Sequence, residues 1–231
     1  MSPRAPAKKG TQARKPKVDH TSPERLNRIF AALDQLFPAA ETALRHENAF
    51  QLLVATILSA QCTDERVNKV TPELFRKFPT PQHFAALRQE VLEREVRSTG
   101  FFRNKARNII AAAKKIVQDF GGRVPQSMEE MLTLPGVARK TANVVLGSAY
   151  GMPTGVVVDT HVFRIARRLK LSRQERPERV EWDLMKLVPQ HRWITFGHQM
   201  IWFGRKLCVA RKPLCAECPL RAVCDSPDKT V

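Results

Sequence analysis

The sequence has few acidic residues for its size, and it lacks a long hydrophobic segment. Its 231 residues include 22 Asp and Glu against 39 Lys and Arg, which gives a formal net charge of +17. The longest uncharged run, residues 141–158, contains Asn143, Ser148 and Pro153 and is therefore a poor membrane span. The N-terminus also lacks the apolar segment of a secretory signal. These absences argue against an integral membrane protein and a secreted one.

The surplus of basic residues predicts a polyanionic partner. Nucleic acid is the commonest such partner, and an anionic membrane surface is the main alternative. Residues 1–18 hold six basic residues and no acidic one, so we expect a flexible basic arm there. The remaining 33 basic residues (39 less six) still exceed the 22 acidic ones. The part of the chain expected to fold is thus basic by itself.

Strand patterns are also missing, and helical periodicity dominates. Only Gly155–Val158 resembles a strand, and it is too short for a sheet. No repeat with a period of about 20–50 residues is present. The apolar content of 43% is sufficient for a hydrophobic core. The sequence predicts an all-α protein of roughly ten helices. These are expected at about 22–36, 48–60, 63–77, 81–98, 103–120, 126–133, 137–150, 159–170, 177–187 and 192–206.

Four of the five cysteines lie near the C-terminus with the spacing C-x6-C-x2-C-x5-C: Cys208, Cys215, Cys218 and Cys224. Thiolates in so short a loop can converge on one centre. Disulfides are disfavoured, because a helical protein without a secretory signal is expected in a reducing compartment. Structural zinc usually takes two C-x2-C pairs about 12–20 residues apart. A [4Fe–4S] cluster held by four cysteines fits the spacing better, and zinc remains the alternative.

Basic residues surround this motif. Arg205 and Lys206 precede it, and Arg211 and Lys212 lie inside its first gap. They are either ordinary solvated charges or cations that a metal-braced loop presents to phosphate. The fifth cysteine, Cys62, stands alone at the end of an apolar stretch and is expected to be a buried free thiol.

A second candidate site lies in the segment Leu134-Pro-Gly-Val-Ala-Arg-Lys-Thr-Ala142. Here a short helix should end and a new one begin near Val137, so backbone N–H groups of a helix N-terminus become available to an anion. This helix–hairpin–helix arrangement suits a phosphate; a plain helical hairpin is the alternative. A nucleotide-binding P-loop is excluded, because Arg139 and Pro135 occupy its glycine positions and no strand precedes.

Lys140 is expected in the first turn of that second helix. The positive end of the helix dipole and the neighbouring Arg139 disfavour a charged ammonium there. An amine attacks carbon only as the free base, so Lys140 is a candidate nucleophile. Asp159, in Val158-Asp-Thr-His161, is expected to cap the next helix and to keep lone pairs that can accept a proton or offset positive charge.

Together these motifs resemble endonuclease III, a family of bifunctional DNA glycosylases and AP lyases of base excision repair. The residues that carry the resemblance are LPGVARKTANVVL (134–146), VDTH (158–161), the four-cysteine motif, LSAQCTDERVNK (58–69) and GFFRNKA (100–106). The similarity extends from about residue 20 to residue 225. Three separate motifs in the same order argue against chance.

The resemblance implies a fold and a reaction. It implies two helical domains, residues 42–154 with the helix–hairpin–helix and residues 19–41 plus 155–231 with the [4Fe–4S] cluster, and an active site in the cleft between them. Lys140 would attack C1′ of a damaged nucleotide, expel the base and form a Schiff base, and Asp159 would assist. β-Elimination would then cleave the strand 3′ to the abasic site. The four cysteines of the C-terminal motif would bind the cluster.

The resemblance also implies how DNA is held. The phosphate contacts would come from backbone amides of Gly136, Val137 and Ala138, with Arg139, Arg211 and Lys212 nearby. Gln61 and Phe101 would insert into the space left by the flipped nucleotide, which must leave the base stack before the bond can be reached. The expected partner is double-stranded DNA with damaged bases, with oxidised pyrimidines as the family's usual lesions. We expect a monomer without membrane contact, cytoplasmic in a bacterium and nuclear or mitochondrial in a eukaryote.

Three positions depart from the family pattern: Ala138 stands where a second glycine is usual, Phe101 where the wedge is a smaller aliphatic residue, and Cys62 where a small residue is usual. The adenine-mismatch glycosylase of the same superfamily is the nearest alternative, but it lacks a lysine at the position of Lys140 and carries a further C-terminal domain. A non-catalytic DNA-binding or redox protein would have no use for Lys140 beside Asp159.

Overall fold

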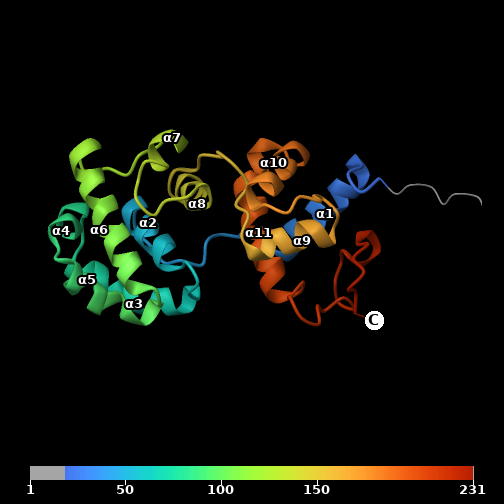
Figure 1. The fold of residues 1–231 in the computed structure, drawn as a ribbon. Helices are drawn as coiled ribbons and strands as arrows, with labels where there is room; N and C mark the ends of the chain where they lie inside the picture. The colour runs from blue at the N-terminus through green and yellow to red at the C-terminus, as the bar shows by residue number, and fades with distance from the viewer. Residues whose placement is uncertain (1–18, 231) are drawn as a thin grey trace, which may run out of the picture.

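The computed structural model describes residues 19–230 (Figure 1). The basic arm expected at 1–18 lies outside the described residues. Within them the chain forms eleven α-helices, three short 3-10 helices and no strand, so the all-α prediction is confirmed. The helices are α1 (Pro23–Leu36), α2 (Ala49–Leu58), α3 (Asp64–Lys77), α4 (Pro81–Ala86), α5 (Gln89–Val96), η1 (Arg97–Thr99), α6 (Phe102–Asp119), α7 (Met128–Met131), α8 (Arg139–Tyr150), α9 (Thr160–Arg168), α10 (Pro177–Leu187), η2 (Gln190–Arg192), α11 (Trp193–Lys206) and η3 (Arg221–Val223).

The buried apolar side chains form two separate cores. The first core contains side chains of α2–α8, and the second contains those of α1 and α9–α11. Figure 1 shows the same division: the N-terminal α1 lies beside the C-terminal helices, not beside α2. The second core is therefore built from both ends of the described chain.

The segment Gly155–Val158 links the two cores. Its extended backbone sends successive side chains to opposite sides. Val156 and Val158 accordingly pack in the second core, whereas Val157 packs in the first. The strand-like pattern in the sequence thus reflects an extended linker that anchors itself in both cores, and no sheet forms there, as expected.

The prediction of a single helix over 81–98 was wrong. The chain forms α4 and α5 instead, because Leu87 and Arg88 adopt extended backbone angles between them. In one continuous helix, Leu92 would be rotated by about 80° from Phe84. The break allows both short helices to pack on α6, with Phe84 and Leu92 fully buried. Burying a side chain of this size contributes about 1.5–3 kcal/mol, which offsets helical hydrogen bonds worth about 0.5–1.5 kcal/mol each.

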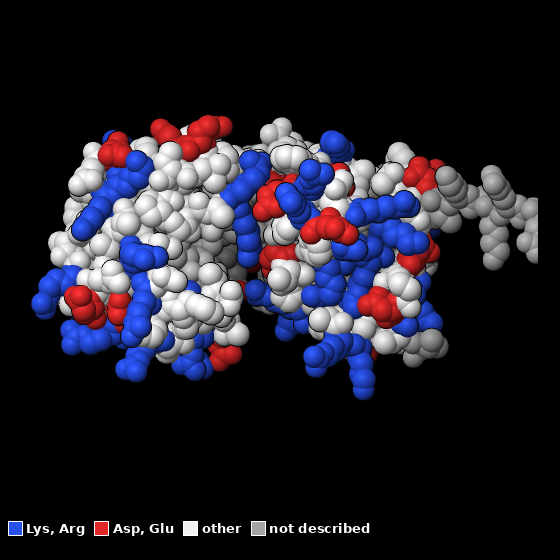
Figure 2. Space-filling model, viewed as in Figure 1, with Lys and Arg blue, Asp and Glu red and all other residues white. Residues whose placement is uncertain are grey.

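Polar contacts join the two halves of the molecule. Arg139 of α8 pairs with Glu181 of α10, and Arg205 of α11 pairs with Asp64 of α3. The segment between α1 and α2 is also bonded to α11, where Trp202 donates its indole N–H to the carbonyl of Glu41 at 3.0 Å. Figure 2 shows a groove between the halves, bordered by Lys and Arg side chains. None of the helices in residues 19–230 has the length and apolar character needed to cross a membrane.

Candidate active site

Lys140 and Asp159 line one pocket, of about 510 Å³ including its open mouth. Lys140 is the second residue of α8, and Asp159 directly precedes α9. Since α8 belongs to the first core and α9 to the second, the pocket combines residues from both halves of the molecule. Lys140 is exposed and Asp159 is half-buried. The two predicted catalytic residues, 19 positions apart in the chain, therefore meet at one opening to solvent.

Asp159 is held firmly. Its Oδ1 accepts hydrogen bonds from the backbone N–H groups of His161 and Val162, both at 2.8 Å, which confirms the predicted N-cap. Because both bonds engage the same oxygen, the second carboxylate oxygen lies outside the cap. A carboxylate arranged in this way is fixed in orientation and can still accept a proton.

The hairpin before Lys140 has the predicted helix–turn–helix form. Val137 N–H donates to the carbonyl of Leu134 at 3.1 Å, and α8 starts two residues later. Gly136 has a φ of +78°, a conformation that strains any residue with a Cβ. A Cβ there would also lie 2.8 Å from Cβ of Asn108 on α6. Gly136 thus allows both the turn and its close packing on α6, and the first N–H groups of α8 have no partner within the helix.

Gln61 and Phe101 share an unusual backbone conformation. Both have positive φ, 51° and 47° respectively, although neither is glycine. Gln61 lies in the loop before α3, and Phe101 directly precedes α6. Both side chains are exposed; for Phe101 the exposed fraction is 63%. Strain of this kind costs on the order of 1–3 kcal/mol and is often found at functional sites. Here it coincides with two exposed side chains at the positions that the resemblance assigns to the DNA wedges.

The three basic residues predicted to contact DNA differ in their surroundings. Arg211 and Lys212 are exposed on the loop between the first two cysteines, and Lys212 has a φ of +52°. Arg139 is committed elsewhere: its Nε lies 3.0 Å from both carboxylate oxygens of Glu181, and its side chain is half-buried. Arg139 therefore joins the two halves of the molecule beside Lys140.

The pocket contains residues that the sequence analysis did not place there. Arg205 had been grouped with the cysteine loop, but it lines the pocket and donates to Oδ2 of Asp64 at 2.7 Å. His198 is buried at the pocket, and its Nε2 lies 3.1 Å from Oγ of Ser148. Burial lowers the pKa of His198, against the opposing effect of Glu41. Only long-range packing brings these residues together, so their spacing in the sequence carried no signal.

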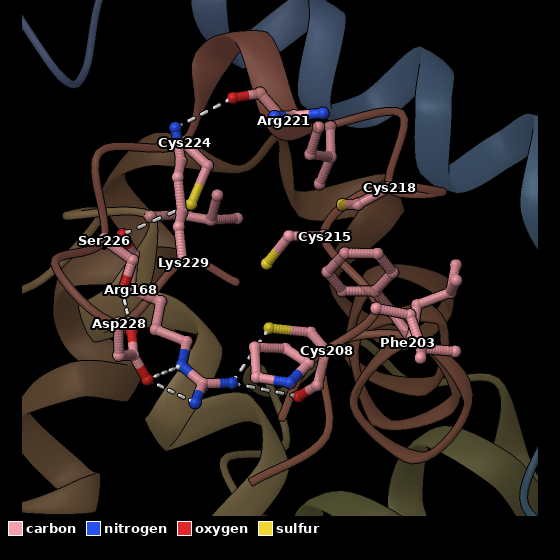
Figure 3. A pocket seen from close by; sticks show the side chains of 15 residues that line it. Arg168, Phe203, Cys208, Cys215, Cys218, Arg221, Cys224, Ser226, Asp228 and Lys229 are labelled. Atoms are coloured by element: carbon pink, nitrogen blue, oxygen red, sulfur yellow. Dashed lines mark hydrogen bonds and ion pairs between the residues drawn. The ribbon is translucent and has the colours of Figure 1, made fainter. Parts of the chain in front are cut away.

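The four C-terminal cysteines surround a common space of about 450 Å³ (Figure 3). The sulfur atoms of Cys208, Cys215, Cys218 and Cys224 point into it, and none of the four forms a disulfide. The side chains of Phe203 and other apolar residues also line this space. Arg168, which is nearly buried, donates to Sγ of Cys208 at 3.3 Å and pairs with Asp228. Four thiols, an apolar wall and a cationic donor form a suitable site for an iron–sulfur cluster.

The geometry favours a cluster over a single zinc ion. Among the described residues, no three His, Cys, Asp or Glu side chains lie close enough together to hold one metal ion. Four thiolates on one zinc would all lie within about 2.3 Å of it. A [4Fe–4S] cluster needs a wider arrangement, because each cysteine binds a different iron. When bound, the cluster would link Cys208, Cys215, Cys218 and Cys224 and so brace the loop that carries Arg211 and Lys212.

Cys62 differs in part from its prediction. It is a free thiol, as expected, but it is half-buried rather than fully buried, and it packs against the first core. Its Sγ lies 3.7 Å from the carbonyl of Thr63, and the side chain also borders a surface hollow with Gln61. The Cys62 side chain, which is larger than the small residue usual in the family, is thus accommodated at the edge of the first core.

Comparisons with known proteins agree with this architecture. Residues 54–190 match the family model described as HhH-GPD superfamily base excision DNA repair protein, and residues 208–224 match the iron-sulfur binding domain of endonuclease III. The chain is 55% identical over 203 residues to endonuclease III of Synechocystis sp. (88% of this chain, 93% of the relative). It is 46% identical over 208 residues to endonuclease III of Bacillus subtilis (88% and 94%).

Solved structures give the same result. A non-covalent endonuclease III–DNA complex superimposes with a TM-score of 0.84 at 44% identity, covering 87% of this chain and 94% of that one. A trapped endonuclease III–DNA covalent intermediate gives a TM-score of 0.82 at 45% identity, covering 87% and 95%. A thermostable thymine-DNA glycosylase, at 20% identity and a TM-score of 0.78, shares the fold.

The fold, the helix–hairpin–helix and the pocket between two helical halves define a base excision DNA repair protein of the HhH-GPD superfamily. Within that superfamily, the chain belongs to the endonuclease III family. It is a DNA glycosylase with AP lyase activity and carries a [4Fe–4S] cluster. Both expectations drawn from the resemblance, the reaction class and the cofactor, are confirmed.

Proposed function

We propose that Lys140 is the nucleophile of this enzyme and that Asp159 assists it. The observation that carries the proposal is the shared pocket, in which an exposed amine and a capped carboxylate approach one opening from two different cores. An amine that reacts with a nucleotide extruded from DNA must be accessible, and Lys140 is exposed. A carboxylate that serves the same centre must be fixed, as Asp159 is.

The reaction then runs in two stages. The free amine of Lys140 attacks C1′ of the damaged nucleotide, the N-glycosidic bond breaks, and the base leaves with a proton. Opening of the sugar ring gives an imine between Nζ and C1′, the Schiff base. Removal of a proton from C2′ then expels the 3′ phosphate and cleaves the strand. Water hydrolyses the imine and returns the amine of Lys140.

Asp159 contributes through Oδ2, the carboxylate oxygen that does not take part in the helix cap. Its negative charge stabilises the positive charge that develops on the sugar as the base departs. The same oxygen can take the proton that the nitrogen of Lys140 loses as it bonds to C1′. Since the cap fixes the carboxylate, little reorganisation is needed when the charge appears.

Duplex DNA with a damaged or abasic nucleotide is the partner that these residues fit. The amides of Gly136, Val137 and Ala138, with the first turn of α8, would hold a phosphate. Gln61 and Phe101 would fill the gap left by the extruded nucleotide, and Arg211 and Lys212 would contact the backbone. The structure of an endonuclease III–DNA complex among the relatives supports this partner. Arg139 would act mainly as a link to Glu181 rather than as a phosphate contact.

The wider assignments rest on the same comparison. We infer that residues 42–154 act as one domain and residues 19–41 with 155–231 as the other, in keeping with the two cores. Oxidised pyrimidines are the proposed lesions, and a monomer is the proposed state. The relatives at 55% and 46% identity are bacterial, which favours action on the chromosome in a bacterial cytoplasm.

Borohydride trapping tests the nucleophile. Wild-type protein should form a covalent complex with an abasic duplex when the imine is reduced, and Lys140→Ala should abolish it. Lys114→Ala is the matched control, because Lys114 is an exposed lysine on α6 away from the pocket. Persistent trapping by Lys140→Ala would refute the assignment. Asp159→Asn should slow base excision about 100-fold or more, in line with the loss of a general base or charge partner.

A further inference from the structure

Lys105 is a buried lysine with no acidic partner. It lies on α6, and only 4% of the residue is exposed. Among residues 19–230, no carboxylate lies within ion-pair distance of its ammonium. Burial of a charged amine is costly unless polar groups surround it. Burial also lowers the pKa of Lys105. A lysine kept in such a place needs a structural or functional reason.

Its ammonium binds two backbone carbonyls from different elements. Nζ donates to the carbonyl of Leu58 at 2.8 Å and to the carbonyl of Thr99 at 2.7 Å. Leu58 is the last residue of α2, where carbonyls lack helical partners and carry the negative end of the dipole. Thr99 ends the 3-10 helix η1. One cation therefore satisfies the ends of two helices that are 41 residues apart in the chain.

Each of these carbonyls lies at the start of a loop that carries a strained, exposed residue. Gln61 follows Leu58 by three residues, and Phe101 follows Thr99 by two. Both have positive φ, and both point a side chain to solvent. The loop from Leu58 leads into α3, whereas the loop from Thr99 leads into α6. Lys105 is the residue through which these two loops are bonded to a common point.

We propose that Lys105 is a positioning residue that sets the spacing between the loops of Gln61 and Phe101, so that both side chains enter the DNA duplex together. The inference deepens the proposed function and rests on it for the wedge roles of Gln61 and Phe101. Without the shared cation, the carbonyls of Leu58 and Thr99 would move apart to find water. The two wedges would then no longer match the gap left by one nucleotide.

The test compares a step that needs wedges with one that does not. An abasic site in duplex DNA must be extruded, whereas an abasic site in a single strand is already accessible. Lys105→Met removes the donors while keeping an unbranched side chain of similar length. It should slow borohydride trapping on the duplex about 10- to 100-fold, because a misplacement of about 1 Å can cost on the order of 100-fold in rate. On the single strand, trapping should stay within about twofold of wild type, since no extrusion is required there.

A fluorescent base reports the wedges directly. 2-Aminopurine placed opposite the abasic site should brighten when wild-type protein inserts side chains beside it, and it should brighten much less with Lys105→Met. Lys114→Met is the matched control: the same change on the same helix, at an exposed lysine. It should match wild type in both assays. If Lys105→Met melts below the assay temperature, Lys105→Gln, which keeps one amide donor group, should give an intermediate duplex rate.

The outcomes separate this proposal from the proposed function. Equal slowing of Lys105→Met on both substrates, or unchanged trapping on the duplex, would overturn the positioning role. If Gln61→Ala and Phe101→Ala both leave the 2-aminopurine signal at the wild-type level, the wedge assignment fails, and the role of Lys105 fails with it. Absence of trapping by wild-type protein on both substrates would count against the proposed nucleophile instead.

Discussion

Arg139 shares its Nε–H between the two carboxylate oxygens of Glu181, and this contact joins the two halves of the enzyme one residue away from the proposed nucleophile. Nε of Arg139 lies 3.0 Å from each carboxylate oxygen, and the side chain of Glu181 is only 5% exposed. Asn143, one turn along α8, donates to the same carboxylate at 2.8 Å. Gly155 of the linker also packs on it, with no room for a Cβ. One buried carboxylate thus holds α8, α10 and the linker together.

Glu181→Gln should therefore impair catalysis without touching the substrate. Oε1 of Glu181 accepts from both Asn143 and Arg139, so a glutamine that keeps its oxygen there turns its NH2 group, a donor, toward Nε of Arg139. The half-buried guanidinium also loses its counter-charge. We expect a loss of about 1–3 kcal/mol of folding stability, typical of a broken buried polar contact. Single-turnover base excision should fall about tenfold or more, because Lys140 shifts with the start of α8. Thermal denaturation and excision rates measure the two effects.

Glu178→Gln provides the control for this prediction. Glu178 lies on the same helix, α10, but it is exposed. It should leave both stability and rate near the wild-type values. Wild-type excision by folded Glu181→Gln would show that the contact is only structural.

Gly136→Ala should weaken DNA binding more than it weakens folding. The methyl group meets a φ of +78° and the side chain of Asn108. The left-handed conformation alone costs about 1–2 kcal/mol in a residue with a Cβ. Crowding at Asn108 would also displace the turn whose amides we propose as the phosphate contact. Binding to an abasic duplex, measured by fluorescence anisotropy, should weaken, and Lys140 should remain chemically competent on a single strand.

Gly151→Ala separates strain from phosphate binding. Gly151 ends the same helix, α8, with a φ of +66° and open space where a Cβ would lie. It should lose a similar amount of stability but bind DNA as wild type does. Equal weakening of DNA binding in both variants would argue against a phosphate site at Gly136.

His198 should make folding stability depend on pH. Burial holds its pKa below the ordinary value of 6.5, so between the two values the unfolded chain binds a proton that the folded one does not. The contribution of His198 to folding stability is therefore fully present above pH 6.5. It is lost as the pH is lowered, by at most about 1.4 kcal/mol per pH unit for one group. Denaturant unfolding at several pH values measures this slope.

His198→Gln should flatten the profile below about pH 6.5. His161, whose pKa burial also lowers, should keep part of the slope. His191→Gln, a change at an exposed histidine, is the control and should leave the profile unchanged. A profile for His198→Gln as steep as that of wild type would assign the dependence to other groups.

Arg168 should help to retain the iron–sulfur cluster. Besides Sγ of Cys208, its guanidinium binds the carbonyls of Val209 and Ala210 and pairs with Asp228. Loss of such surrounding contacts often lowers metal affinity about 10- to 100-fold. Arg168→Gln should therefore lose its visible absorbance and its iron to a chelator faster than wild type. Arg167→Gln, the change at the exposed neighbour, should not. Equal rates of cluster loss in both variants would contradict this role.

Local patterns in the sequence were enough for most helices and for the chemistry. Ser127 caps α7 as the Ser-x-x-Glu pattern predicts, with Oγ accepting from the N–H of Glu130 at 3.2 Å. Ser22 stands at the N-cap of α1, but its side chain makes no cap bond. Pro23, at the first helical position, still fixes where α1 begins. Local signals are reliable where the partner atoms lie within one turn.

Contacts between distant residues could not be read from the sequence. Arg139 looked like a phosphate contact because its partner Glu181 is 42 positions away. Lys105 stood in a motif typical of the family, yet nothing in the motif indicated that its ammonium is buried against Leu58 and Thr99. A charged residue looks the same in a sequence whether its side chain is solvated or buried. Only the packing of helices from separate segments distinguishes the two.

The composition of the second core has a consequence during synthesis. Side chains of α1, such as Ile29 and Leu33, pack there against residues that begin at Val156. About 120 residues must therefore be translated before α1 meets its first partners in that core. At about 5–20 residues per second this takes roughly 6–24 s, during which the apolar face of α1 stays uncovered. The first core, by contrast, lies in one continuous stretch and can close on the ribosome first, so the cell makes the helix–hairpin–helix half before the half that binds the iron–sulfur cluster.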